Sequence, residues 1–338
     1  EVFVCRQYSP EGAMTADFTE DATCCSSIIK ETSVDKKAVC ERFRGVYPAL
    51  FTPFDGKLRV NEEELRALVE HNLASGLRGF FVCGSSGEGF LLRVEERKRV
   101  AEIVVEQTAG RGPCIIHVGH TSSDVAADLA RHAESIGADG ISSVPPIYYK
   151  VGFEGCVLHY RTIAKACGLP FIVYNIPATT GVSVTTKEMA ALFRIETIVG
   201  MKFTDSDYYE MRNIIESAEE DCIILSGSDQ LFVPALTMGA GGAIGTTQNI
   251  MPKFFVKLHQ TYLRGDFEAA RQMQYQANRV IRELLAYGSV SAWKSVLKVQ
   301  GFDFGPCRAP LKTLSESEEA ALLERLEGLE GLSLDKAR

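Results

Sequence analysis

The sequence predicts an α/β protein, a (β/α)8 barrel followed by a C-terminal helical appendix. From Arg44 onward, short runs rich in β-branched and aromatic residues alternate eight times with amphipathic helical stretches. Strands that alternate with helices pair in parallel, because each helix returns the chain to the same end of the sheet. Eight such rounds favour a closed barrel of the TIM type, and an open doubly wound sheet is the alternative.

The expected strands are short apolar runs, each bounded by glycine, proline or polar residues. Between them, the stretch 61–75 places Leu65, Leu68, Val69 and Leu73 on one helical face, and the stretch 123–136 is also predicted as a helix. The eight predicted strands are residues 45–51, 77–84, 114–119, 140–144, 171–175, 198–203, 222–227 and 242–247.

After the eighth strand the pattern is helical throughout, over residues 253–264, 267–287, 292–299 and 316–326. We therefore expect a barrel over residues 44–265 and a helical segment over 266–338. Residues 1–43 are rich in Ser, Thr, Asp and Glu without a sustained period, so we interpret them as an N-terminal extension or processed leader of unassigned role. They fit neither a secretory signal, which needs a continuous apolar core, nor a transit peptide, which is poor in acidic residues.

Composition excludes several classes of partner. The chain has 338 residues, 46% of them hydrophobic and 24% charged, which is ordinary for a soluble globular protein. Its net charge of -8 argues against nucleic acid or an anionic membrane as a partner. No stretch approaches the ~18 to 20 apolar residues that span a bilayer. This composition is common among soluble enzymes.

Six of the ten cysteines lie scattered in apolar runs, as Cys83, Cys114 and Cys222 do, and we interpret them as small buried hydrophobes. This usage is typical of a reducing compartment, so we expect a cytoplasmic protein. The other four crowd the first 40 residues without CxxC spacing, so no zinc site is expected there. They are Cys5, Cys24, Cys25 and Cys40.

Lys202 is a charged residue inside a predicted buried strand, residues 198–203. Burying an ammonium group is costly, so such a site favours the neutral amine, which is a nucleophile. The alternative is a lysine at a strand end that reaches out to solvent. The first interpretation predicts covalent chemistry at the end of the sixth strand.

In a (β/α)8 barrel the chemistry gathers at the C-terminal ends of the strands. The second predicted strand runs into GSSGEG at residues 84–89, where glycines let backbone amides approach an anion and the hydroxyls of Ser85 and Ser86 can donate to a carboxylate. The loop lacks the Walker lysine, the GxGxxG spacing and the GxSxG pattern. A tight turn without a ligand is the alternative.

Other strand ends carry hydroxyl and amide groups. Tyr148 and Tyr174 follow the fourth strand and end the fifth, where they could relay a proton through a serine hydroxyl; a place at the barrel rim is the alternative for either ring. The seventh and eighth strands lead into SGSDQ at 226–230 and GTTQN at 245–249. Such a lining suits a polyol or a hydroxy acid.

As an ordered set, GSSGEG, YNIP at 174–177, GMKFTDSD around Lys202 and GAGGAIGTTQN at 239–249 resemble the N-acetylneuraminate lyase and dihydrodipicolinate synthase superfamily of class I pyruvate aldolases. The resemblance covers about residues 44 to 315. It implies a (β/α)8 barrel with C-terminal helices, which is usually a homotetramer, and a lysine that forms a Schiff base with pyruvate. It implies no metal and no other cofactor.

The resemblance also implies roles for single residues. Lys202 attacks the keto carbon of pyruvate or of a 2-keto acid, and the iminium becomes the electron sink for the carbon–carbon bond. Tyr174 carries the proton of the substrate hydroxyl. Ser85 and Ser86 hold the pyruvate carboxylate with the neighbouring amides, and they link Tyr174 to Tyr148, which the adjacent subunit lends in this family.

Substrate choice depends on positions where the branches of the superfamily differ. Dihydrodipicolinate synthases typically carry an arginine five positions after the YNxP tyrosine, but Thr179 stands there, which argues against a dicarboxylic aldehyde. Thr204 matches the lyase pattern, and Gly227, Asp229 and Thr246 fall where lyases bind the hydroxyls of the open-chain sugar. Two departures are Gln230, where lyases usually have glutamate, and Gln248, where they often have an aromatic residue.

We therefore expect a lyase that cleaves N-acetylneuraminate to N-acetylmannosamine and pyruvate. A dihydrodipicolinate synthase or a 2-keto-3-deoxy sugar acid aldolase is the alternative among enzymes, and a pyruvate-binding regulatory barrel is the alternative outside them. A metal-dependent aldolase is disfavoured, because His117 and His120 should point to opposite faces at strand spacing. No strand-end phosphate motif favours a flavin-dependent barrel.

Overall fold

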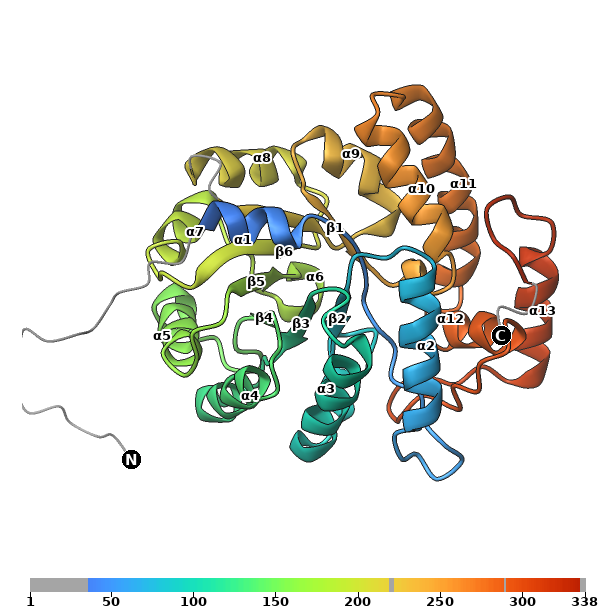
Figure 1. Ribbon diagram of the computed structural model, residues 1–338, viewed down its shortest axis with the longest axis horizontal. Coiled ribbons are helices and arrows are strands. Elements are labelled where there is room, and N and C mark those ends of the chain that lie inside the picture. Colours follow the sequence, from blue (N-terminus) through green and yellow to red (C-terminus); the bar gives the residue numbers. More distant parts are fainter. Residues whose placement is uncertain (1–35, 219–221, 289, 335–338) are drawn as a thin grey trace, which may run out of the picture. The chain divides into compact units, whose positions relative to one another are not determined.

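A computed structural model describes residues 36–218, 222–288 and 290–334. In this part of the chain, eight parallel strands form one sheet in the order β1-β8-β7-β6-β5-β4-β3-β2, with the helices packed around it (Figure 1). The two edge strands meet through a parallel bridge between Ala49 and Phe81, and the N–H of Leu50 donates to the carbonyl of Phe81 at 2.9 Å. The sheet thus closes on itself, so the (β/α)8 barrel is confirmed and the open doubly wound sheet is excluded.

Every strand is buried along its whole length, because the barrel interior covers one face and the helices cover the other. This explains why the strands are nearly continuous apolar runs in the sequence. The predicted strands are confirmed, although several predictions ran on into the loops beyond the C-terminal ends. The strands are β1 Gly45–Pro48, β2 Phe80–Val82, β3 Cys114–His117, β4 Gly140–Ser143, β5 Phe171–Asn175, β6 Ile198–Phe203, β7 Ile223–Ser226 and β8 Gly242–Gly245.

Some of the helices that surround the barrel begin at polar caps. Asn61 accepts a hydrogen bond from the N–H of Glu64 at the start of α2, and Thr185 and Glu188 form a capping box at the start of α7. These helices are α2 Glu62–Ala74, α3 Val94–Thr108, α4 Ser123–Ser135, α5 Gly152–Ala164, α6 Pro177–Thr180, α7 Thr186–Leu192, α8 Tyr208–Ser217, α9 Phe232–Thr237 and α10 Pro252–Leu263. Short 3-10 turns follow β2, β7 and β8: η1 Gly89–Leu91, η2 Asp229–Leu231 and η3 Thr247–Asn249.

Helix α1, Lys36–Phe43, packs against β6 and β7. Cys40 and Phe43 are buried, and the thiol of Cys40 donates to the carbonyl of Val199. The sequence pattern predicts these residues as part of the N-terminal extension, because eight residues are too few to show a helical period. Residues 1–35, with Cys5, Cys24 and Cys25, lie outside the described residues.

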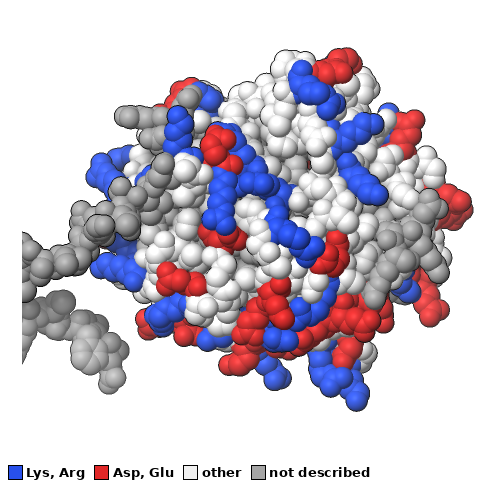
Figure 2. All heavy atoms as spheres, in the orientation of Figure 1, with Lys and Arg blue, Asp and Glu red and all other residues white. Residues whose placement is uncertain are grey.

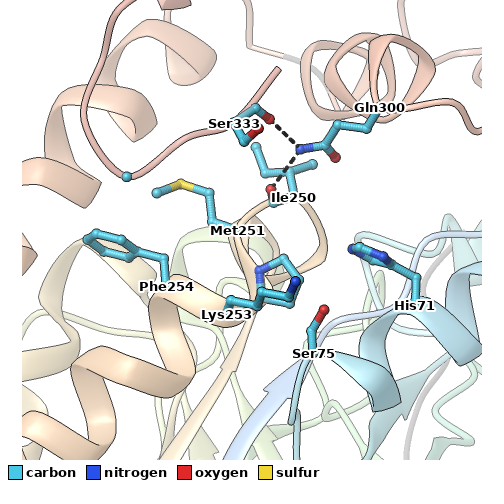
Figure 3. A pocket seen from close by; sticks show the side chains of 10 residues that line it. His71, Ser75, Ile250, Met251, Lys253, Phe254, Gln300 and Ser333 are labelled. Carbon is cyan, nitrogen blue, oxygen red and sulfur yellow. Dashed lines mark hydrogen bonds between the residues drawn. The ribbon is translucent and has the colours of Figure 1, made fainter. Parts of the chain in front are cut away.

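The C-terminal segment forms α11 Phe267–Leu285, α12 Ser291–Val299 and α13 Glu316–Leu326, close to the predicted bounds. Helix α11 packs on α10 and α13 (Figure 1). After α12, the amide of Gln300 donates to the carbonyls of Ile250 and Ser333 at 3.0 and 2.8 Å and so ties the C-terminal tail to the start of α10 (Figure 3). The cavity of about 230 Å³ beside Gln300 contains none of the predicted site residues.

Charged side chains of both signs are intermingled over the described part of the face shown in Figure 2. Several form ion pairs between neighbouring helices, such as Arg99 with Glu62 and Arg66 with Glu106. The six cysteines predicted to be buried are buried. None of the helices that the structure describes is long and apolar enough to cross a membrane.

Candidate active site

Lys202 lies inside the barrel, at the C-terminal end of β6. Its residue is only 3% exposed, and its Nζ lies 4.0 Å from the centre of the Tyr174 ring and 4.3 Å from that of Phe81. Tyr174 is its direct neighbour in the register of β5 and β6. The prediction of a buried lysine is therefore confirmed, and the alternative of a lysine that reaches solvent is wrong.

A register shift brings these two residues together. β5 and β6 slip by one residue between Phe171 and Ile172, and only after this irregularity does Tyr174 stand beside Lys202. Two residues before the lysine, a Cβ on Gly200 would lie 2.0 Å from the carbonyl of Ile223. Glycine is thus required for β6 and β7 to approach closely just below the lysine.

Gly227, just after β7, leaves room for the side chains that surround the amine. A Cβ at this position would lie 1.7 Å from Oγ1 of Thr204 and 3.2 Å from Cε of Lys202. The hydroxyl of Thr204 is buried and has no hydrogen-bond partner in the described part of the chain. An unpaired buried hydroxyl beside the lysine can bind a polar group of a substrate.

The GSSGEG loop, residues 84–89, forms a tight turn beyond β2. The N–H of Glu88 donates to the carbonyl of Ser85 at 3.1 Å, and the hydroxyl of Thr52 donates to the carbonyl of Gly87 at 2.7 Å. Within the described residues, the N–H groups of Ser85, Ser86 and Gly87 find no acceptor. Successive unpaired N–H groups in a turn form a concave site for an anion. The side chain of Ser85 is exposed.

The loop also reaches past the end of β1 to the end of β8. Ser86 is buried, and its hydroxyl lies 2.7 Å from that of Thr246, so the two share a hydrogen bond. This contact joins the predicted anion site after β2 to the predicted sugar site after β8. The structure therefore brings together residues that lie far apart in the sequence.

Behind the loop, Glu88 forms a buried ion pair that sequence reasoning missed. Its side chain is 0% exposed and its Oε1 lies 2.5 Å from Nζ of Lys294 on α12, whose side chain is 4% exposed. The other oxygen, Oε2, accepts a hydrogen bond from the backbone N–H of Arg308 at 2.7 Å. The available signal was a lysine within an otherwise buried stretch of a C-terminal helix.

Asp229 is buried at the start of η2. It accepts hydrogen bonds from the N–H of Thr247 at 2.7 Å and from the amide of Gln248 at 3.0 Å. Burial raises the pKa of this carboxyl, against the opposing effects of these donors and of the nearby charge of Lys202. Gln248, noted as a departure from the lyases, is therefore a direct partner of a predicted sugar-binding residue.

Gln230 lies at the surface, next to the buried Asp229. It is exposed and lines a cleft of about 500 Å³ with residues of α9, α10 and α11, such as Pro234, Tyr262 and Tyr275. None of the other predicted site residues lines this cleft.

Tyr148 lies on the surface of the single chain, whereas Tyr174 is buried. It is 88% exposed, its ring contacts that of Tyr149 edge-on at 5.1 Å, and its backbone has a positive φ of 81°. Such a conformation is strained for a residue with a large side chain and is typical of functional sites.

His117 is a further residue of the barrel interior whose role sequence reasoning missed. Its ring lies 6.0 Å from that of Tyr174, and its Nε2 accepts a hydrogen bond from the N–H of Val144. Burial, together with the charges of Arg97 and Lys202, holds the pKa of His117 well below its usual value, so the imidazole is neutral. The other histidine of the pair, His120, accepts from the N–H of Ser122 in the loop after β3.

The profile of the Dihydrodipicolinate synthetase family matches residues 42–328. The chain belongs to this family. The N-acetylneuraminate lyase of Rhizobium meliloti (strain 1021) is 37% identical over 283 residues, which cover 84% of this chain and 94% of that protein. Membership of the dihydrodipicolinate synthetase family, together with lyase relatives of this similarity, identifies the chain as a class I aldolase, a carbon–carbon lyase.

Solved structures of the family from both branches share the fold. The Clostridium difficile protein CdNal in complex with mannosamine has a TM-score of 0.82 and 31% identity, covering 85% of this chain and 99% of that one. The dihydrodipicolinate synthase of Aquifex aeolicus has a TM-score of 0.80 and 32% identity, covering 84% of this chain and 97% of that one. Fold similarity does not distinguish the lyase activity from the synthase activity. The residues at the strand ends must therefore distinguish them.

Proposed function

We propose that the protein cleaves N-acetylneuraminate to N-acetylmannosamine and pyruvate through a Schiff base on Lys202. One observation carries this proposal: the amine of Lys202 is enclosed by the rings of Phe81 and Tyr174 at the end of a barrel strand. This position holds the amine at the barrel mouth, where it can attack the keto carbon of a bound substrate. The lyase relatives support the same reaction.

In the proposed mechanism, the amine attacks the keto carbon of the open-chain sugar acid, and loss of water gives an iminium. The iminium accepts the electrons of the carbon–carbon bond as that bond breaks, while the proton of the neighbouring hydroxyl passes to Tyr174. The resulting enamine takes a proton at carbon and becomes the iminium of pyruvate. Water then hydrolyses this iminium, which releases pyruvate and restores the amine.

The loop after β2 would bind the carboxylate of the substrate. The unpaired N–H groups of Ser85, Ser86 and Gly87 and the exposed hydroxyl of Ser85 provide donors for two carboxylate oxygens. Charge-assisted hydrogen bonds of this kind fix the orientation of the keto carbon relative to Lys202.

The distal hydroxyls of the sugar would lie along the ends of β6, β7 and β8. Thr204 offers an unpaired hydroxyl, Gly227 leaves the space beside it, and Asp229 and Thr246 follow on the next two strand ends. Thr179, in α6, supplies no positive charge for a second carboxylate, which disfavours aspartate semialdehyde. Gln248, where lyases often have an aromatic residue, donates its amide to Asp229, a predicted sugar-binding residue. This difference favours, as a second candidate substrate, another 2-keto-3-deoxy sugar acid.

The site would be completed by a second subunit. Tyr148 projects into solvent from a strained turn, where a neighbouring chain can receive its hydroxyl next to Ser85 and Tyr174. We therefore propose a homotetramer with Tyr148 donated across an interface. A cytoplasmic location stays a prediction.

Reduction with borohydride in the presence of pyruvate tests the Schiff base. We expect a covalent adduct on the peptide that contains Lys202, and its complete loss in Lys202→Ala, because no other amine can replace it. Lys298→Ala, which removes an exposed lysine of α12, is the control and should keep the adduct. A wild-type protein without an adduct on Lys202 would overturn the mechanism.

Parallel assays decide the substrate. N-acetylneuraminate, aspartate semialdehyde with pyruvate, and 2-keto-3-deoxy sugar acids are offered to the same preparation. We expect turnover of N-acetylneuraminate. Turnover of the semialdehyde alone would reverse the assignment.

A further inference from the structure

We infer that Lys294, on a helix outside the barrel, positions the carboxylate-binding loop (residues 84–89) through its ion pair with Glu88. The inference rests on the proposed function, which assigns this loop to the substrate carboxylate. The two side chains are buried and bind each other and the C-terminal segment, so we infer that both act through the backbone of the loop and not by touching the substrate. They are positioning residues.

The ion pair is closed to solvent on all sides. Nζ of Lys294 lies 2.5 Å from Oε1 of Glu88, 3.5 Å from the carbonyl of Pro306 and 4.7 Å from the centre of the Phe54 ring. Oε2 of Glu88 accepts from the N–H of Arg308 at 2.7 Å. Both oxygens of this loop carboxylate are therefore bound by donors of the C-terminal segment.

The backbone of Glu88 explains why the loop needs such a contact. Its φ of 55° lies in the left-handed region, which a residue with a Cβ occupies only where its surroundings hold it. From this conformation its N–H reaches the carbonyl of Ser85 and closes the turn. The same turn leaves the N–H groups of Ser85 to Gly87 unpaired, so the conformation of Glu88 sets the shape of the anion site.

Arg308 clamps the far end of the loop. Its guanidinium donates to the carbonyl of Leu91 at 3.1 Å and pairs with Glu96 of α3 at 2.5 Å. The loop is thus held on one side by β2 and on the other by the segment from Lys294 to Arg308. A buried ion pair adds little net stability compared with an apolar pair of similar shape, but it fixes direction. Its main consequence here is the geometry of the loop.

The test compares four variants with the wild-type protein. Lys294→Met breaks the pair and leaves a buried carboxylate without its cation. The double variant E88Q/K294M removes both charges but keeps an oxygen for the N–H of Arg308, and E88M/K294M removes that oxygen too. Lys298→Met, on the same helix, removes an exposed ion pair with Glu319 and is the matched control.

Hydrogen exchange of the backbone N–H groups measures how well the loop is ordered, independently of catalysis. In Lys294→Met, a peptide spanning residues 84–91 should exchange faster, because the N–H groups of Glu88, Gly89 and Leu91 lose the turn that protects them. Lys298→Met should match the wild type in this peptide. Unchanged exchange in folded Lys294→Met or in E88M/K294M would overturn the inference, whatever the enzyme's substrate.

The apparent affinity for pyruvate measures how the position of the loop affects the active site. The pyruvate concentration that half-saturates adduct formation on Lys202 should rise about tenfold in Lys294→Met and in E88M/K294M, the equivalent of one misplaced hydrogen bond, and should stay at the wild-type value in Lys298→Met. E88Q/K294M, which keeps an oxygen for the N–H of Arg308, should show a smaller rise than E88M/K294M. The rate at saturating pyruvate should change little. Wild-type half-saturation in folded Lys294→Met would assign the pair a structural role only. Failure of the wild type itself to form an adduct would instead contradict the proposed function.

Discussion

At the scale of single residues, the site depends on two glycines whose lack of a side chain leaves room for polar neighbours. A Cβ on Gly227 would overlap the hydroxyl of Thr204, and a Cβ on Gly245 would lie 1.6 Å from Oδ1 of Asp229. In both cases a polar side chain from another strand end occupies the space where the glycine's Cβ would otherwise lie. The positions of Thr204 and Asp229 are therefore determined as much by their glycine neighbours as by their own backbones.

Gly227→Ala should lower kcat/KM for N-acetylneuraminate by at least about tenfold, because the added methyl group displaces the side chain of Thr204 and crowds that of Lys202. Crowding of this kind should also cost about 1 to 3 kcal/mol of stability. Steady-state kinetics and urea denaturation measure the two effects. Gly56→Ala, where the added Cβ meets no atom within 4 Å, is the control. Wild-type kinetics in Gly227→Ala would contradict the crowding argument.

At the scale of elements, buried polar groups join helices to strands. His159 of α5 is hydrogen-bonded to Ser123 of α4 at 2.9 Å and to Ser143 of β4 at 3.3 Å, so one imidazole links three elements. Burial lowers its pKa to about 4 from 6.5. Between pH 6.5 and 4, His159 therefore binds a proton in the unfolded chain but stays neutral in the folded chain.

The sign of this linkage predicts acid sensitivity. The free energy of unfolding should fall as the pH drops from 6.5 toward 4, with His159 contributing about 3 kcal/mol of that loss. In His159→Gln, an amide can still bond both serines but does not titrate in this range. Urea denaturation at pH 6.5 and 4.5 should thus show a shallower pH dependence in the variant. The same dependence as in the wild type would assign the acid sensitivity to other groups.

At the scale of the whole molecule, the sequence pattern predicted the barrel because buried parallel strands are continuous apolar runs, and it predicted Lys202 because a charge interrupts one of them. It did not reveal the slip between β5 and β6, since a register shift leaves no periodic trace. The pair of Glu88 and Lys294 stayed hidden because its members lie 206 positions apart. Gln230 was placed by analogy, and its exposure on an outer cleft shows how little a motif fixes side-chain direction.

Subunit mixing tests whether the active site is shared. Tyr148→Phe and Lys202→Ala should each be nearly inactive as pure proteins, because one lacks the hydroxyl and the other the amine. Once their subunits exchange, mixed oligomers contain some sites with both groups, so activity should return. Sedimentation should give a tetramer, and mixing two separate preparations of Lys202→Ala is the control. No recovery after proven exchange would place Tyr148 outside the site of the neighbouring subunit.

The contact between Lys294 and Glu88 also limits how the chain can be shortened. A protein engineer who trims the polypeptide after residue 265 would retain all eight strands and the nucleophilic lysine. The truncated barrel would nevertheless expose the back of the GSSGEG loop. The carboxylate of Glu88 would lose its positively charged partner, Lys294. A smaller catalyst built on this scaffold must therefore carry a substitute for that support, such as a shape-matched apolar patch beneath the loop.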